Sequence, residues 1–162
     1  MNHLLVKTLL LLCFVNLLVG CEKSNDPYQA FEKGDYETAY AGFYKLAKEK
    51  EDLAAINYLG VINYLGYGRK RDVQAARKWF ELAANKGFAG AEFNLGNIYA
   101  NGEGVPQDFI QAYMWFYIAK EAGHDQAEKR MSVLLADHKL FSNQAMHAVE
   151  LADDFIATLK RE

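Results

Sequence analysis

GYGRKRDVQAARKWFELAANKG, residues 66–87, and GEGVPQDFIQAYMWFYIAKEAG, residues 102–123, follow one pattern at a spacing of 36 residues. Aligned without a gap, residues 55–90 and 91–126 are identical at twelve positions. The identical pairs are Ala55/Ala91, Leu59/Leu95, Gly60/Gly96, Ile62/Ile98, Gly66/Gly102, Gly68/Gly104, Asp72/Asp108, Ala76/Ala112, Trp79/Trp115, Phe80/Phe116, Ala83/Ala119 and Gly87/Gly123. A period of this length is typical of stacked helix pairs, so the sequence predicts an all-α fold, a short solenoid.

The identical residues predict two helices in each repeat. Ala55, Leu59 and Ile62 recur at intervals of four and three residues and therefore share one face of a first helix. Gly66 can adopt the positive φ angle that ends this helix, and Asp72 is placed to cap the next one. The equivalent residues of the second copy are expected to do the same.

The second helix of each repeat is predicted to be capped by an aspartate and to carry core aromatic residues. Trp79 and Phe80 lie on its inward stripe, and Trp115 is equivalent to Trp79. We therefore expect both tryptophans in the core rather than on a platform that stacks ligand rings. Gln111 follows the cap Asp108 by three residues, which is the spacing of a capping box.

The basic run Arg69, Lys70 and Arg71 raises the question of an anion site next to the glycines. The second copy has VPQ at the same place. A phosphate cradle would also need main-chain N–H groups presented by a strand-to-helix turn, and no strand precedes this run. The sequence therefore predicts a solvated loop between helices, with a local anion site as the alternative.

Two segments carry a family resemblance. AAINYLGVINYLGYG, residues 54–68, and AEFNLGNIYANGEGVPQD, residues 91–108, resemble Sel1-like repeats, which are relatives of the tetratricopeptide repeat. The resemblance covers residues 55–126. It implies a solenoid that acts by binding another protein, with the first helix of each pair on the concave side.

Further helices are predicted on both sides of these repeats. GDYETAYAGFYKLAKE, residues 34–49, resembles a tetratricopeptide second helix capped by Asp35, and its short partner would begin near Asp26 and Pro27. A last helix is predicted to start at the N-cap Ser142 and to seal the array. Its apolar stripe is Ala145, Val149, Ala152, Ile156 and Leu159. The predicted domain is 27–162, with repeats near 27–54, 55–90 and 91–126 and a degenerate cap at 127–160 that contains Ala127, Met131 and Leu134.

Residues 1–20 are predicted to be a signal peptide, because Lys7 precedes an apolar run of the usual length. The segment ends in LVGC, Leu18–Cys21, which resembles a bacterial lipobox; this implies cleavage before Cys21 and lipidation of its thiol. Residues 21–26 would then be a short linker. Glu22 follows the cysteine, so the resemblance implies the outer membrane, facing the periplasm. A plain signal peptide is the alternative.

The composition of the mature chain excludes several functions. Cleavage removes Lys7 and no acidic residue, so 17 of the 18 basic residues remain against 21 acidic ones, a net charge of −4. This charge argues against nucleic-acid binding. Cys13 is removed and Cys21 is lipidated, so we expect no disulfide and no cysteine-bound metal.

We expect no catalytic residue, no metal and no cofactor. His124, His138 and His147 have no second histidine or cysteine at helical ligand spacing, and no serine has the context of a nucleophile. The sequence therefore favours a protein that is not an enzyme.

A partner-binding surface is predicted on the first helices, about 180° from the buried stripe. Its candidate residues are Asn57, Val61, Tyr64, Phe93 and Asn97, with Tyr28 on the preceding helix. These positions differ between the copies, and exposed aromatic and amide side chains are common in protein interfaces. The alternative is that packing or the capping helix covers them.

The predicted function is that of a membrane-anchored periplasmic module for protein–protein interaction. The resemblance implies an adaptor in envelope assembly, secretion or signalling, or an immunity protein that binds a toxic effector. The alternative is a cell-wall or β-lactam-active hydrolase of the Sel1-like type, but this chain lacks the paired cysteines of those relatives.

Overall fold

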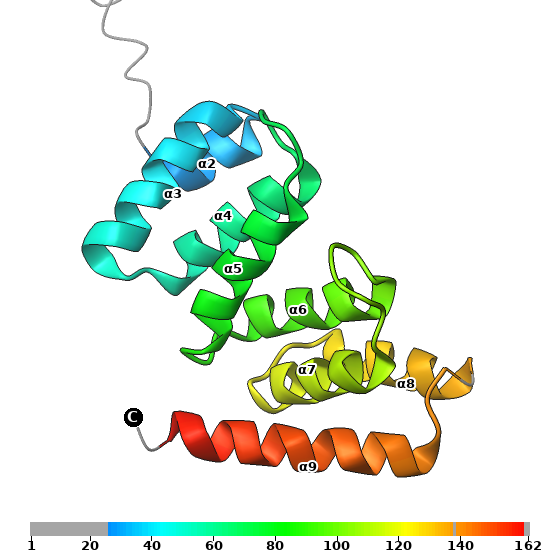
Figure 1. Cartoon of the computed structure of the whole chain (residues 1–162). Coiled ribbons are helices and arrows are strands. Elements are labelled where there is room, and N and C mark those ends of the chain that lie inside the picture. The colour runs from blue at the N-terminus through cyan, green and yellow to red at the C-terminus, as the bar shows by residue number, and fades with distance from the viewer. Residues whose placement is uncertain (1–25, 138, 161–162) are drawn as a thin grey trace, which may run out of the picture.

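A computed structural model describes residues 26–137 and 139–160, which form eight α-helices and no strand. The helices are α2 (Pro27–Glu32), α3 (Tyr36–Lys50), α4 (Leu53–Leu65), α5 (Val73–Ala84), α6 (Ala89–Asn101), α7 (Phe109–Glu121), α8 (Ala127–Ala136) and α9 (Ser142–Leu159). Consecutive helices from α2 to α8 pack on one another as stacked pairs (Figure 1). The predicted all-α solenoid is confirmed. The predicted signal peptide and Cys21 lie outside the described residues.

Aspartate caps begin five of these helices. The carboxylates of Asp35 and Asp72 accept hydrogen bonds from main-chain N–H groups of the first turns of α3 and α5, at 3.2 and 2.9 Å. Asp108 accepts two such bonds at α7, at 2.9 and 3.0 Å. The predicted caps are confirmed, and Asp26 and Asp52 cap α2 and α4 in the same way. The reciprocal bond predicted from the Gln111 side chain is not formed among the described residues.

Glycine ends the first helix of each repeat and also admits its partner helix. Gly66 and Gly102 have φ angles of 73° and 68° at the ends of α4 and α6, as predicted. Gly60 lies inside α4, where a Cβ atom would overlap the ring of Phe80 on α5. The aromatic ring of each second helix therefore sits directly on the backbone of the first.

The core consists of two adjoining clusters. One joins α2, α3 and α4 around Phe43 and Leu59, and the other runs from Ile56 of α4 to α9 around Phe80 and Phe116. Trp115 is buried in the second cluster, as predicted, with 8% of its surface exposed. Trp79 is only half-buried, so the predicted core position holds in part for this residue. Its ring lies between the two clusters and packs on both.

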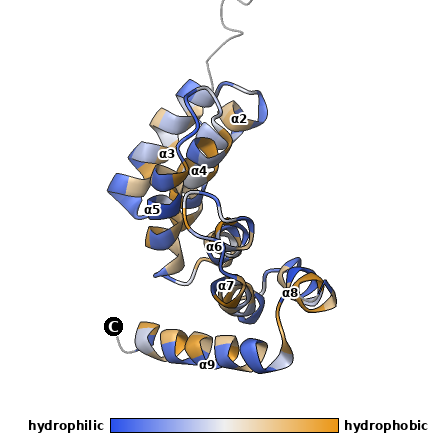
Figure 2. Cartoon of the chain, turned by 45° about the vertical axis from the view of Figure 1, so that its right-hand side comes forward, coloured by the Kyte–Doolittle hydropathy of each residue, from blue (hydrophilic) through white to orange (hydrophobic). Residues whose placement is uncertain are grey.

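The last helix, α9, does not pack mainly on α8, the helix that precedes it in the chain. α9 packs on α7 rather than on α8, and Figure 2 shows α8 to one side of both. Buried Ala145, Ala148 and Ala152 make this contact close. Ser142 is the first residue of α9 and not its N-cap, which corrects the prediction. The N-cap is Phe141, whose N–H donates to the Gln144 side chain at 3.0 Å.

None of the helices in the described part of the chain is long and apolar enough to cross a lipid bilayer.

Candidate functional site

The predicted partner-binding residues form a row along α4 and α6, which we call the first-helix row. It consists of Asn57, Val61, Tyr64, Phe93 and Asn97. All five side chains are half-buried, and so is Tyr28 on α2. Their surroundings therefore lie between the predicted exposed surface and the alternative of coverage by packing. The reason is that their side of each first helix also faces the next repeat.

Two amides of the first-helix row connect successive first helices. Asn94 donates its side-chain N–H to Asn57 Oδ1 at 3.0 Å, which links α6 to α4. Arg130 on α8 donates to Asn97 Oδ1 at 2.7 Å, which links α8 to α6. Each row amide thus accepts a hydrogen bond from the next first helix along the array. These bonds orient the amides before any partner arrives.

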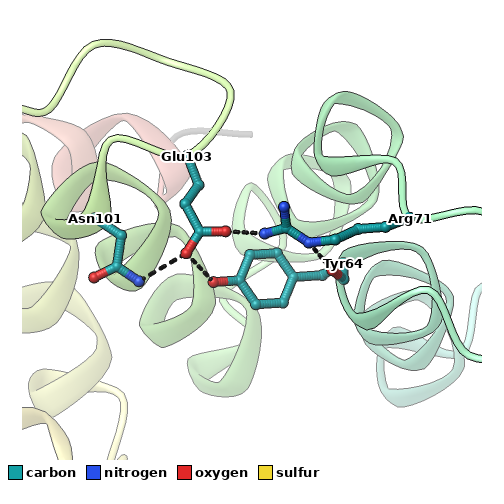
Figure 3. Close-up of polar contacts among 4 residues, drawn as sticks. All are labelled: Tyr64, Arg71, Asn101 and Glu103. Carbon is teal, nitrogen blue, oxygen red and sulfur yellow. Dashed lines mark hydrogen bonds and ion pairs between the residues drawn. The ribbon is translucent and has the colours of Figure 1, made fainter.

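Four polar residues, Tyr64, Arg71, Asn101 and Glu103, form a cluster at the end of α4 (Figure 3). The Tyr64 hydroxyl and the Asn101 amide both donate to Glu103 Oε1, at 2.9 and 3.0 Å. Arg71 forms an ion pair with Glu103 Oε2, and its Nε donates to the Tyr64 main-chain oxygen at 2.8 Å. The Glu103 carboxylate is therefore satisfied on both oxygens, and the loop after α6 is held against the end of α4.

Two residues of the basic run, Arg69 and Arg71, are engaged in contacts within the protein. Arg71 belongs to the cluster, and the Arg69 guanidinium lies over the ring of Tyr40 at 3.4 Å from its centre, a cation–π contact. Lys70 is exposed. Two of the three cations are thus engaged by neighbouring helices and loops, which weakens the alternative of an anion site at this loop.

Phe93 contacts the second helix of its own repeat and the turn that follows this helix. Its ring stacks on His124 with 4.1 Å between ring centres and also packs on Phe116 at 5.4 Å. Burial lowers the pKa of His124, and the nearby Asp125 opposes this shift. A neutral imidazole is suited to stacking on a phenyl ring. Among the described histidines, His124 is thus a packing residue; His138 lies outside the described residues.

Val61 and Tyr28 have different surroundings. Val61 packs against the larger core cluster. The Tyr28 hydroxyl donates to Asp52 Oδ1 at 3.5 Å, and its ring meets Phe43 edge-on at 5.0 Å. Burial raises the pKa of Tyr28, and the carboxylate of Asp52 adds to the shift. Tyr28 therefore lies at the N-terminal end of the described array, where its ring also meets Tyr58 of α4 edge-on at 5.4 Å.

One chemically unusual residue was missed by the sequence analysis. Glu92 on α6 is 1% exposed, and its Oε2 has no hydrogen-bond partner among the described residues. Burial raises its pKa to about 7. The repeat alignment holds a signal for it, since the equivalent residue of the first repeat is the buried Ile56. A carboxyl at an apolar core position could have been noticed there.

The described part of the chain offers a surface suited to binding. Residues 26–137 and 139–160 contain no group of three or more histidine, cysteine, aspartate or glutamate side chains that could hold a metal ion. The first-helix row offers aromatic surface and oriented amides, which suit contact with another protein.

The comparisons with known proteins agree with this architecture. Residues 53–88 and 89–124 each match the Sel1 repeat family. A Sel1 repeat protein from Oxalobacter formigenes is 27% identical, with a TM-score of 0.64 over 80% of this chain and 54% of its own. A protective antigen present in uropathogenic Escherichia coli strains, with an SLR fold, is 30% identical, with a TM-score of 0.72.

The match to the antigen covers 81% of this chain and 28% of that protein. The chain therefore spans about half the length of the first relative and about a quarter of the length of the second. No curated protein matches the chain at a significant level. The family repeats have the same 36-residue period as the sequence alignment and begin two residues earlier, at the observed starts of α4 and α6. The chain therefore contains two Sel1 repeats, at residues 53–88 and 89–124.

Proposed function

We propose that this protein binds another protein along the first-helix row and is held in the bacterial envelope by a lipid on Cys21. Sel1 repeats are in general protein–protein interaction modules, and stacked helix pairs present an extended surface to partners. We assign the protein no catalytic activity. Its role would be that of an adaptor in envelope assembly, secretion or signalling, or of an immunity protein against a toxic effector.

The observation that carries the binding proposal is the set of contacts between the first-helix row and the next repeat. Asn57, Tyr64 and Asn97 each have a hydrogen bond of 3.0 Å or less that crosses between repeats. Each of these residues keeps part of its surface open to solvent, since its exposure is intermediate. A surface that is ordered before binding loses less conformational entropy on association. The row is therefore suited to a specific partner.

Photo-crosslinking in intact cells tests this surface. A photoreactive phenylalanine analogue at position 64 replaces one aromatic residue by another, and we expect it to capture a specific protein. The matched control is the same analogue at Tyr117, which is also half-buried but lies on the second helix α7. Equal capture at both positions, or capture at Tyr117 alone, would show that the partner uses another face.

The anchoring part of the proposal has its own test. Cys21→Ala is expected to abolish labelling by radioactive fatty acid and to move the protein from the membrane fraction to the soluble fraction. Cys13→Ala is the control, because Cys13 lies in the segment that cleavage would remove, and labelling should persist. Membrane retention of the Cys21→Ala protein would contradict the lipid anchor. Density fractionation of the membranes would check the outer-membrane expectation.

A further inference from the structure

A pocket of about 460 Å³ lies between α6, α7 and the C-terminal part of α9. Figure 1 shows that this end of α9 is on the same side of the molecule as the turn between α5 and α6. Ile118 and Ile156 contribute apolar surface, and Glu92, Glu121, Asp153 and Lys160 are its charged residues. The pocket is separate from the first-helix row, none of whose members lines it.

Glu92 is the unusual member of this lining. Its side chain is almost completely buried, and Oε2 has no hydrogen-bond partner among residues 26–137 and 139–160. Burying an unpaired carboxyl costs free energy. The first repeat has Ile56 at the equivalent position, where an apolar side chain fills the core. Packing at this position thus does not require a carboxyl group, and the fold alone does not explain Glu92.

The charges around the pocket favour a cationic ligand. Three of its four ionisable residues are acidic, and the single base is Lys160. In the described part of the chain, Lys160 forms no ion pair with Glu92, Glu121 or Asp153, while Glu121 pairs with Lys120 at 3.3 Å. A carboxylate or phosphate would be repelled by these acids. The absence of a three-ligand cluster in the described residues argues against a bare metal ion.

We propose that this pocket binds an alkylammonium group, with its cationic head paired to Glu92 and its aliphatic stem against Ile118 and Ile156. The head would supply the partner that Oε2 lacks, and the stem would cover the apolar surface. This chemistry is shared by a free aliphatic amine and by a lysine side chain of a bound protein. The proposal does not depend on the first-helix row.

The ionisation of Glu92 supports this assignment. With a pKa of about 7, raised by burial, its carboxyl is half ionised at neutral pH, and a bound cation favours the ionised form. The other charged groups that line the pocket are Glu121 on α7, Asp153 on α9 and Lys160, which follows the end of α9. Binding of an amine should therefore lower the pKa of Glu92 and tighten as the pH rises through 7.

Titration with n-butylammonium tests the proposal on the purified full chain in detergent. The carboxyl ¹³C resonance of Glu92 should report a pKa that falls by roughly half a unit or more when the amine is present. n-Butanol and pentanoate have the same butyl stem without the cation and should leave the pKa unchanged. An equal shift with n-butanol, or no shift with n-butylammonium, would overturn the assignment.

Two variants test whether Glu92 is the residue that pairs with the cation. Glu92→Gln keeps the shape of the side chain and should weaken n-butylammonium binding by at least about tenfold, which corresponds to the loss of one charged pair. Glu121→Gln is the matched control on the same pocket and should change the affinity by less than about threefold. Unchanged binding to Glu92→Gln would overturn the proposal. The wild-type titration needs no variant and decides the question even if this variant does not fold.

A further ligand distinguishes the two sources of the alkylammonium group, a free aliphatic amine and a lysine side chain of a bound protein. N-acetyl-lysine N-methylamide has the lysine side chain on a peptide backbone. If it binds more tightly than n-butylammonium, the pocket takes a lysine of a protein partner; if it binds more weakly while n-butylammonium still binds, the pocket takes a free amine. Failure of both amines would overturn the pocket assignment and leave the crosslinking test at position 64 unaffected.

Discussion

The hydroxyl of Tyr64 donates a 2.9 Å hydrogen bond to Glu103 Oε1, which joins the first helix of one repeat to the loop of the next. The two residues are 39 positions apart in the chain. Asn101 and Arg71 complete the surroundings of the carboxylate. Tyr64 is therefore part of the structure as well as of the proposed binding surface, and its two roles need separate measurements.

Tyr64→Phe separates them, because it removes the hydroxyl and keeps the ring. We expect the free energy of unfolding to fall by about 0.5–1.5 kcal/mol, the usual contribution of one hydrogen bond. Urea unfolding followed by circular dichroism measures this. Tyr117→Phe is the control, since its hydroxyl makes no hydrogen bond among the described residues, and its effect should be within about 0.5 kcal/mol. Equal losses in both variants would show that the Glu103 contact contributes nothing to stability.

Gly60→Ala should destabilise the first repeat because the added Cβ would overlap the Phe80 ring. Overpacking of this kind costs about 1–3 kcal/mol. Phe80→Leu in the same chain makes room, so the double variant should be more stable than the sum of the two single effects predicts. Strict additivity in a double-mutant cycle, measured by urea unfolding, would contradict the close contact between these residues.

The two tryptophans should differ in their contributions to stability although they are equivalent in the repeat. Trp115 is 8% exposed and meets Phe155 of α9 edge-on at 5.1 Å, whereas Trp79 is half-buried. Trp115→Ala should cost about 3–5 kcal/mol, and Trp79→Ala clearly less, because less buried surface is lost. Thermal melts of both variants measure this. Equal melting temperatures would contradict the difference in burial.

The buried Glu92 predicts that stability falls as the pH rises. Its folded-state pKa of about 7 lies above the unfolded value of about 4.3. The folded chain therefore binds more protons than the unfolded chain between these two values, and stability decreases across this window. The loss should be roughly 1–3 kcal/mol and complete a little above pH 7, since nearby solvent and charges moderate the shift.

Glu92→Gln removes this titration and provides the control. Urea unfolding at several pH values from 5 to 8 should show the variant gaining stability relative to the wild type as the pH rises. All other ionisable groups are present in both proteins, so their contributions largely cancel in the difference. A difference that is constant with pH would mean that Glu92 is ionised throughout this range in the folded state.

The sequence by itself determined the features that depend on residues close together in the chain. The repeat at 36 residues, the aspartate caps at Asp72 and Asp108 and the glycine ends at Gly66 and Gly102 were all predicted and observed. The reason is physical: a cap joins a side chain to an N–H two or three residues away. A positive φ angle concerns one residue, and an apolar stripe follows from 3.6 residues per turn.

Only the tertiary structure decided the features that depend on contacts between distant segments. Periodicity assigns a side chain to a face of its helix but does not tell what covers that face. Trp79 therefore differs from Trp115, and the first-helix row is half-buried by the next repeat. The position of α9 on α7 decides which groups surround Glu92, because the pocket takes its walls from α6, α7 and α9. The burial that raises the pKa of Glu92 is thus a property of packing, which no local pattern of residues specifies.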